Sequence, residues 1–140
     1  MARPHLKMLS GDYQCLANIA RDRGSNPQCR LCPSSSAPPE TITHILMQCT
    51  GTTDSRNRVW SELLNIVAAI FPKNQILSGL TSPEIAAQFI LDCTSLNLGN
   101  DIRIDICHHG AATIFQRTRQ YCYAVHSERT NKLKRLGLVK

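Results

Sequence analysis

The proline-rich loop of residues 25–40 most constrains how this chain can fold, because it lacks the regular backbone hydrogen bonds that would stabilise it. Prolines at positions 27, 33, 38 and 39 remove backbone donors and the serines between them favour turns, so residues 25–40 form neither a helix nor a long strand. This loop and a short helix predicted over residues 41–48 supply four side chains that zinc prefers: Cys29, Cys32, His44 and Cys49. We therefore predict that one structural Zn²⁺ ion staples the loop.

The spacing of these four side chains suits a tetrahedral ion. A CxxC turn places two sulfur atoms ~3.5–4 Å apart on one side of the ion, because each Zn–S bond is about 2.3 Å long. Around a continuous helix, His44 and Cys49 lie about 140° apart, so we expect the helix to end or unwind between them. All four ligands are protein side chains and no position is left for water, which predicts a structural and not a catalytic metal.

Other interpretations of the cysteines are disfavoured. They could be buried small hydrophobic residues with His44 on the surface, but a proline-rich loop has no core of its own. A redox CxxC is expected after a strand and at the start of a helix, whereas this motif lies between Pro27 and Pro33. A second metal group is conceivable among Cys107, His108, His109, Cys122 and His126. Cys107 and Cys122 fall on an apolar stripe, however, which favours buried thiols.

Apolar side chains recur at helical spacing along most of the chain. The pattern predicts a helix from Asp12 to a stop at Gly24, the short helix 41–48, and helices over residues 54–71 and 81–93. Residues 102, 104 and 106 are isoleucines that alternate as in a strand, but the longer-range spacing favours one terminal helix from about Asn100 to about Leu133. The predicted fold class is all-α: a compact helical domain with a zinc-stapled N-terminal loop and a long C-terminal helix.

The length and composition indicate a single domain over residues 1–140. We divide it into a zinc-binding subregion (1–53), a helical bundle (54–133) and a basic tail (134–140). No apolar run approaches the ~20 residues that a membrane-spanning helix needs, and the N-terminus does not resemble a secretory signal. Seven cysteines then indicate thiols or metal ligands in a reducing compartment, so we expect an intracellular protein, nuclear or cytoplasmic, with no membrane partner.

The formal charge of +6 is concentrated at the C-terminus, where residues 117–140 carry seven basic side chains against Glu128 alone. We predict that nucleic acid, RNA or DNA, contacts six of them: Arg117, Arg119, Arg129, Lys132, Lys134 and Arg135. The alternatives are a solvated helix end, since basic residues favour the C-terminus of a helix, and contact with a protein partner. Tyr123 is the candidate for stacking on a base, because Tyr121 lies on the predicted core face.

Residues 6–32, "LKMLSGDYQCLANIARDRGSNPQCRLC", and residues 40–49, "ETITHILMQC", resemble the zinc-binding (CCHC) region near the carboxyl end of reverse transcriptases of non-LTR retrotransposons. The resemblance covers about residues 6–60 and rests on Leu9, Ser10, Gly11, Cys29, Cys32, Glu40, Thr41, His44, Leu46 and Cys49. It implies a zinc-organised module that contacts template RNA or target DNA, or braces the polymerase. On this interpretation the chain is a fragment of such a protein, or a freestanding gene derived from one.

No paired-aspartate polymerase motif or nuclease carboxylate set accompanies the resemblance. Glu84 and Asp92 lie in an ordinary amphipathic helix, so we expect no enzymatic activity and no small-molecule substrate. The predicted function is a zinc-stabilised, non-catalytic nucleic-acid-binding module. The alternative is a repurposed adaptor or regulator that binds a protein partner.

Overall fold

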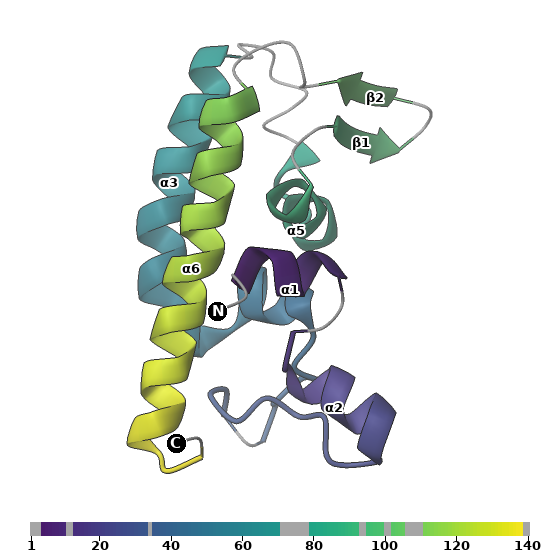
Figure 1. The fold of residues 1–140 in the computed structure, drawn as a ribbon, viewed down its shortest axis with the longest axis vertical. Coiled ribbons are helices and arrows are strands. Elements are labelled where there is room, and N and C mark those ends of the chain that lie inside the picture. The colour runs from purple at the N-terminus through teal and green to yellow at the C-terminus, as the bar shows by residue number, and fades with distance from the viewer. Residues whose placement is uncertain are drawn as a thin grey trace.

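The computed structural model describes residues 4–10, 13–33, 35–70, 79–92, 95–99, 102–105 and 111–138. Its elements are helices α1 (Pro4–Ser10), α2 (Leu16–Arg23), α3 (Thr53–Ile70), α5 (Pro83–Leu91) and α6 (Ala111–Arg135), a π-helical turn η1 (His44–Gln48), a 3₁₀ turn η2 (Thr50–Thr52), and strands β1 (Ser95–Gly99) and β2 (Ile102–Asp105). The predicted class is confirmed: the domain is helical and has a long C-terminal helix (Figure 1).

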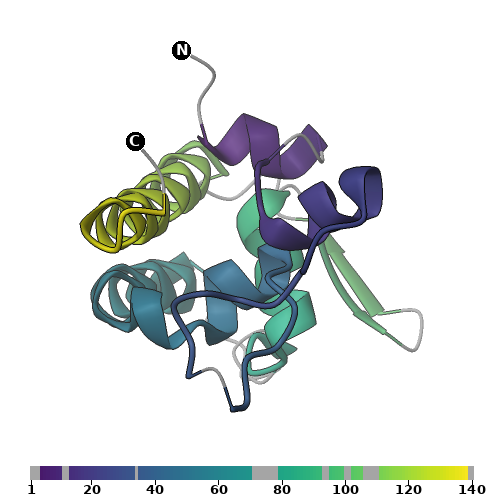
Figure 2. The ribbon, with the colours of Figure 1, turned by 90° about the horizontal axis from the view of Figure 1, so that it is seen from below.

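The antiparallel pair of α3 and α6 forms one side of the molecule (Figures 1 and 2). The predicted apolar face of α3 is confirmed, since Leu63 and Val67 are fully buried. The Trp60 and Tyr121 rings meet edge to face with their centroids 5.8 Å apart. The Tyr121 hydroxyl donates to the Leu46 carbonyl, which joins α6 to η1.

Helices α1 and α5 complete the core on the other side of α6. Helix α5 lies within the predicted range of 81–93, begins with Ser82 as N-cap and Pro83 in the first turn, and buries Phe89 and Ile90 completely. Helix α1 was not predicted. Its buried His5 forms a hydrogen bond from Nε2 to the Leu91 carbonyl oxygen at 3.0 Å and packs on the ring of Phe115, so it joins α5 to α6.

The helix predicted from Asp12 begins later than expected, at Leu16. Tyr13 precedes the helix, and its carbonyl accepts bonds from the Cys15 amide at 2.9 Å and the Asn18 side chain at 3.0 Å. Asp12 itself lies outside the described residues. The predicted stop is confirmed, because Gly24 has a left-handed conformation with φ 68° that glycine adopts without a Cβ clash.

The predicted start of the terminal helix near Asn100 is wrong. Residues Ile102–Asp105 form β2, which pairs antiparallel with β1 and places Ile104 opposite Leu96. Pairing with β1 therefore makes residues 102–105 a strand, although Ile104 fits the spacing of the predicted helix. Helix α6 begins at Ala111, directly after Gly110 in the sequence, a residue type that costs about 1 kcal/mol relative to alanine inside a helix.

Helix α6 ends two residues beyond the predicted Leu133, at Arg135, in a Schellman motif. The Leu138 amide donates to the Leu133 carbonyl at 2.9 Å and the Gly137 amide to the Lys134 carbonyl at 3.0 Å, with Gly137 at φ 72°. Of the helices in the described ranges, none combines the length and apolar character needed to cross a membrane.

Candidate metal centre

The proline-rich loop has a defined path because its two ends pair with each other. Gln28 and Pro39 form an isolated antiparallel bridge, flanked by hydrogen bonds from the Cys29 amide to the Pro38 carbonyl (2.8 Å) and from the Glu40 amide to the Pro27 carbonyl (2.7 Å). This pairing closes the loop around the CxxC motif. It also aligns Cys29 with the start of the segment that carries the other two candidate ligands.

The turn η1 presents His44 and Cys49 to the loop. Thr41 Oγ1 accepts the His44 amide at 3.0 Å, and the Cys49 amide reaches back five residues to the His44 carbonyl at 2.7 Å. This wider π-type turn replaces the α-helical spacing that would separate the two side chains, and Cys49 is itself extended. The prediction that the helix must unwind between His44 and Cys49 is confirmed.

The four predicted ligands form a compact cluster in which all ligand atoms lie within 4.8 Å of one another. Sγ of Cys49 lies 3.7 Å from Sγ of Cys29 and 3.9 Å from Sγ of Cys32, while Sγ of Cys32 lies 3.4 Å from Nε2 of His44. A tetrahedral ion with Zn–S of about 2.3 Å and Zn–N of about 2.0 Å gives S···S edges of ~3.8 Å and S···N edges of ~3.5 Å. The cluster can therefore hold one metal ion of this size with its four positions filled by protein.

The electrostatics of the cluster favour a metal-binding thiolate. The hydrogen bond between the Cys29 and Cys49 sulfur atoms lowers the pKa of Cys29 to about 5. The same bond and burial raise the pKa of Cys49 above its ordinary value. A bound divalent cation supplies the positive charge that stabilises both thiolates.

Neighbouring groups hold the ligands in place. Thr50 Oγ1 donates to Sγ of Cys32 at 3.5 Å, and Arg56 Nη1 donates to the Cys49 carbonyl at 2.8 Å. His44 is buried, and its Nδ1 has no hydrogen-bond partner among the described residues.

Gly51 packs so closely that an added Cβ would lie 2.5 Å from Cβ of Leu31, so the turn η2 fits against the CxxC loop only with glycine at this position.

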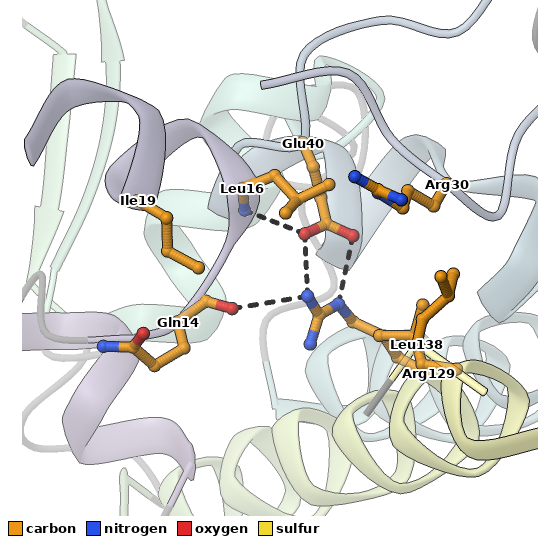
Figure 3. Close-up of a pocket in the computed structure, with 8 residues that line it drawn as sticks. Gln14, Leu16, Ile19, Arg30, Glu40, Arg129 and Leu138 are labelled. Carbon is orange, nitrogen blue, oxygen red and sulfur yellow. Dashed lines mark hydrogen bonds and ion pairs between the residues drawn. The ribbon is translucent and has the colours of Figure 1, made fainter. Parts of the chain in front are cut away.

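A buried ion pair joins the loop to α6 (Figure 3). Arg129 donates to both Glu40 oxygens, from Nη2 to Oε1 at 2.7 Å and from Nε to Oε2 at 3.1 Å. Oε1 also accepts the Leu16 amide at 2.9 Å, so Glu40 caps the N-terminus of α2, whose N-cap Cys15 provides no side-chain bond. Although burial alone lowers the pKa of Arg129, the hydrogen bond and charge of Glu40 raise it overall.

This ion pair corrects the predicted role of Arg129. The residue is only 8% exposed and its guanidinium is directed at Glu40 and at the Gln14 carbonyl, so it does not belong to a solvent-facing row. Arg129, Lys132 and Arg135 lie three positions apart, a spacing that by itself is typical of one exposed helix face. The partner Glu40 is 89 positions away in the sequence, so no local sequence pattern indicates that Arg129 is buried.

The other predicted contact residues are more accessible. Lys134 and Arg135 are exposed, whereas Lys132 is half-buried and pairs with Glu128 at 3.7 Å. Arg117 forms a surface ion pair with Glu62 at 3.5 Å, and Arg119 lies over the Phe115 ring at 5.4 Å. Contacts of this kind contribute little to stability and leave the charges available.

The structure gives no support to a second metal group within the part of the chain that it describes. Cys122 is fully buried in the core, and burial raises its pKa to about 12. His126 Nδ1 forms a hydrogen bond with the Tyr13 hydroxyl at 2.7 Å, and burial lowers the pKa of His126. Residues 107–109 lie outside the described ranges.

Comparison with protein-family models, curated proteins and solved structures finds no match for the chain. The resemblance to retrotransposon reverse transcriptases thus stays a prediction from the motif.

Proposed function

We propose that the chain is a zinc-stabilised nucleic-acid-binding module without catalytic activity, of the kind found in the carboxyl-terminal region of non-LTR retrotransposon reverse transcriptases. The observation that carries the metal assignment is the close cluster of Cys29, Cys32, His44 and Cys49. Three cysteines and a histidine at tetrahedral separations are a ligand set that zinc prefers. With the four positions taken by protein, the ion stabilises the loop and leaves none open for substrate.

The charge distribution supports the nucleic-acid part of the proposal. The net charge of +6 arises in residues 117–140, most of which belong to α6. Phosphate contacts by lysine and arginine release counterions and supply salt-sensitive affinity. The metal-held loop positions this helix through the Glu40–Arg129 pair, which gives the zinc a scaffolding role in binding.

The proposal is tested by titrating the zinc-loaded protein against labelled RNA and DNA over a salt series. The double variant Lys134→Gln/Arg135→Gln is expected to reduce the slope of log K against log salt by ~1.5 to 2, as two lost phosphate contacts require. The matched control Lys7→Gln/Arg23→Gln removes the same charge from exposed residues of α1 and α2, and should leave the slope unchanged. Absence of binding by the parent protein at low salt rules the proposal out.

A second candidate, a protein-binding adaptor, is favoured by one observation. Leu6 and Phe115 are 54% and 41% exposed, and the His5 ring on α1 packs against that of Phe115. Exposed apolar side chains that gather on one face are typical of protein contacts. A nuclease-resistant complex that is lost in Leu6→Ser/Phe115→Ser, with nucleic-acid affinity unchanged, would support this candidate.

A further inference from the structure

A groove between the first turns of α3 and the C-terminal half of α6 has a lining that differs from the rest of the basic surface. It has a volume of about 520 Å³, and its walls include Arg58 of α3 and four residues of α6: Tyr123, Ser127, Asn131 and Arg135. These four recur every fourth position, so they form one ridge ~18 Å long on the helix. The groove thus combines an aromatic ring, a hydroxyl, an amide and two guanidinium groups.

Tyr123 differs from the other two tyrosines in its exposure to solvent. Its side chain is 62% exposed, whereas Tyr13 and Tyr121 are buried and hydrogen-bonded. A tyrosine at the edge of a groove presents a flat apolar ring face that is not buried in the hydrophobic core and does not stabilise it. Such a ring, set among cations, is a stacking platform for an unpaired base.

The charges of the groove favour an anionic ligand. Arg58, Lys132 and Arg135 face Asp54 and Glu128, which leaves a net positive charge. Glu128 is already engaged, because it accepts the Ser55 amide at 3.2 Å and pairs with Lys132. Arg58 and Arg135 form no ion pair with any described residue and are exposed, so their guanidinium groups are available to phosphates.

We infer that this groove binds a single-stranded segment of nucleic acid, with one base stacked on Tyr123 and the flanking phosphates on Arg58 and Arg135. This inference rests on the proposed function and specifies its ligand. A duplex does not suit the groove, because its base faces are already stacked on one another and are not available to the Tyr123 ring. Ser127 and Asn131 lie along the ridge where they can reach the edges of neighbouring bases.

The test measures binding of a fluorescein-labelled 12-nucleotide RNA, the single-stranded DNA of the same sequence, and the corresponding DNA duplex. Tyr123→Leu keeps an apolar side chain but removes the ring, and is expected to weaken both single-stranded complexes about tenfold and the duplex complex little. Tyr123→Phe keeps the ring and should retain the parent affinity. Arg58→Gln should lower the slope of log K against log salt by about one, as the loss of one phosphate contact requires. The control Arg23→Gln should not, because it lies on α2, which is separate from the α3–α6 pair (Figure 1) that forms the groove.

The outcomes separate the inference from the proposed function. If the parent protein binds with a steep salt dependence and Tyr123→Leu binds equally well, the stacking site is wrong while the nucleic-acid module stands. If all three ligands bind equally and Tyr123→Leu weakens them equally, preference for single strands is wrong. If the parent protein binds none of them, both proposals fail and the groove is left to a protein partner. Tighter binding of the RNA than of the single-stranded DNA would identify RNA as the ligand of the groove.

Discussion

The loop of residues 25–52 and the α3–α6 pair are stabilised in different ways. The helices bury continuous apolar faces, with Leu63 and Val67 of α3 fully inaccessible, so their stability derives from area removed from water. Residues 25–40 of the loop contain four prolines and few apolar side chains, and their order derives from polar interactions: the candidate metal ligands, the Gln28–Pro39 bridge and Glu40. Ile45 and Leu46 of η1, in contrast, are buried in the same core as the helices. A region without its own core depends on a few specific groups, each of which has a large effect.

The largest expected effect is loss of the metal. Cys49→Ser should abolish binding of one equivalent of zinc and expose the amides of residues 25–52 to hydrogen exchange, because structural zinc sites contribute binding energy directly to folding. The α3–α6 pair should keep most of its helicity. The control is Cys122→Ala, which also replaces a buried cysteine but should retain full zinc content. Equal zinc content in Cys49→Ser would contradict the assigned ligand set.

The Glu40–Arg129 pair is the connection between the two regions, and breaking it should have the next largest effect. Arg129→Met leaves the Glu40 carboxylate, 1% exposed, without its partner, which costs roughly 3–5 kcal/mol of unfolding free energy. The double variant Glu40→Gln/Arg129→Met should be less destabilised than the sum of the single variants, since no charge remains buried. Urea denaturation of the four proteins measures this coupling, and additive effects would mean that the pair does not interact.

A core truncation in α3 should affect the helical region alone. Leu63 is fully buried, so Leu63→Ala is expected to cost roughly 2–5 kcal/mol through lost transfer energy and the cavity left behind. Zinc stoichiometry should stay at one, because the ligand cluster does not include α3. Thermal melts combined with zinc analysis check both points, and zinc loss that coincides with the unfolding of α3 would show that the two regions are not separable.

The two regions also differ in how much of them could be predicted from sequence. The ligand set was accessible because four chemically distinctive residues lie within 21 positions, and the periodic helices α3 and α5 carried their own signals. Arg129 was misassigned because its partner Glu40 is distant in sequence and a buried arginine has the same local pattern as an exposed one. Strand β2 was missed because its four residues give a weaker signal than the apolar helical spacing that follows them in the sequence. Its pairing with β1 depends on the tertiary structure and leaves no local pattern.

The smallest expected effect is a pH dependence that originates outside both the metal cluster and the core face of α3. Burial, and then the charges of Arg129 and Lys7, lower the pKa of His126 below its ordinary 6.5, and its Nδ1 forms a hydrogen bond with the Tyr13 hydroxyl. Below about pH 6.5, His126 therefore binds a proton more readily in the unfolded chain than in the folded chain. The free energy of unfolding is thus highest above that pH, where the ring is neutral in both states, and falls on acidification. His126→Gln cannot titrate and should lose less stability between pH 7.5 and 5.5 than the parent protein, as measured by urea denaturation. Acid effects on the metal site are common to both proteins and cancel in the comparison, so an equal loss would show that His126 does not contribute.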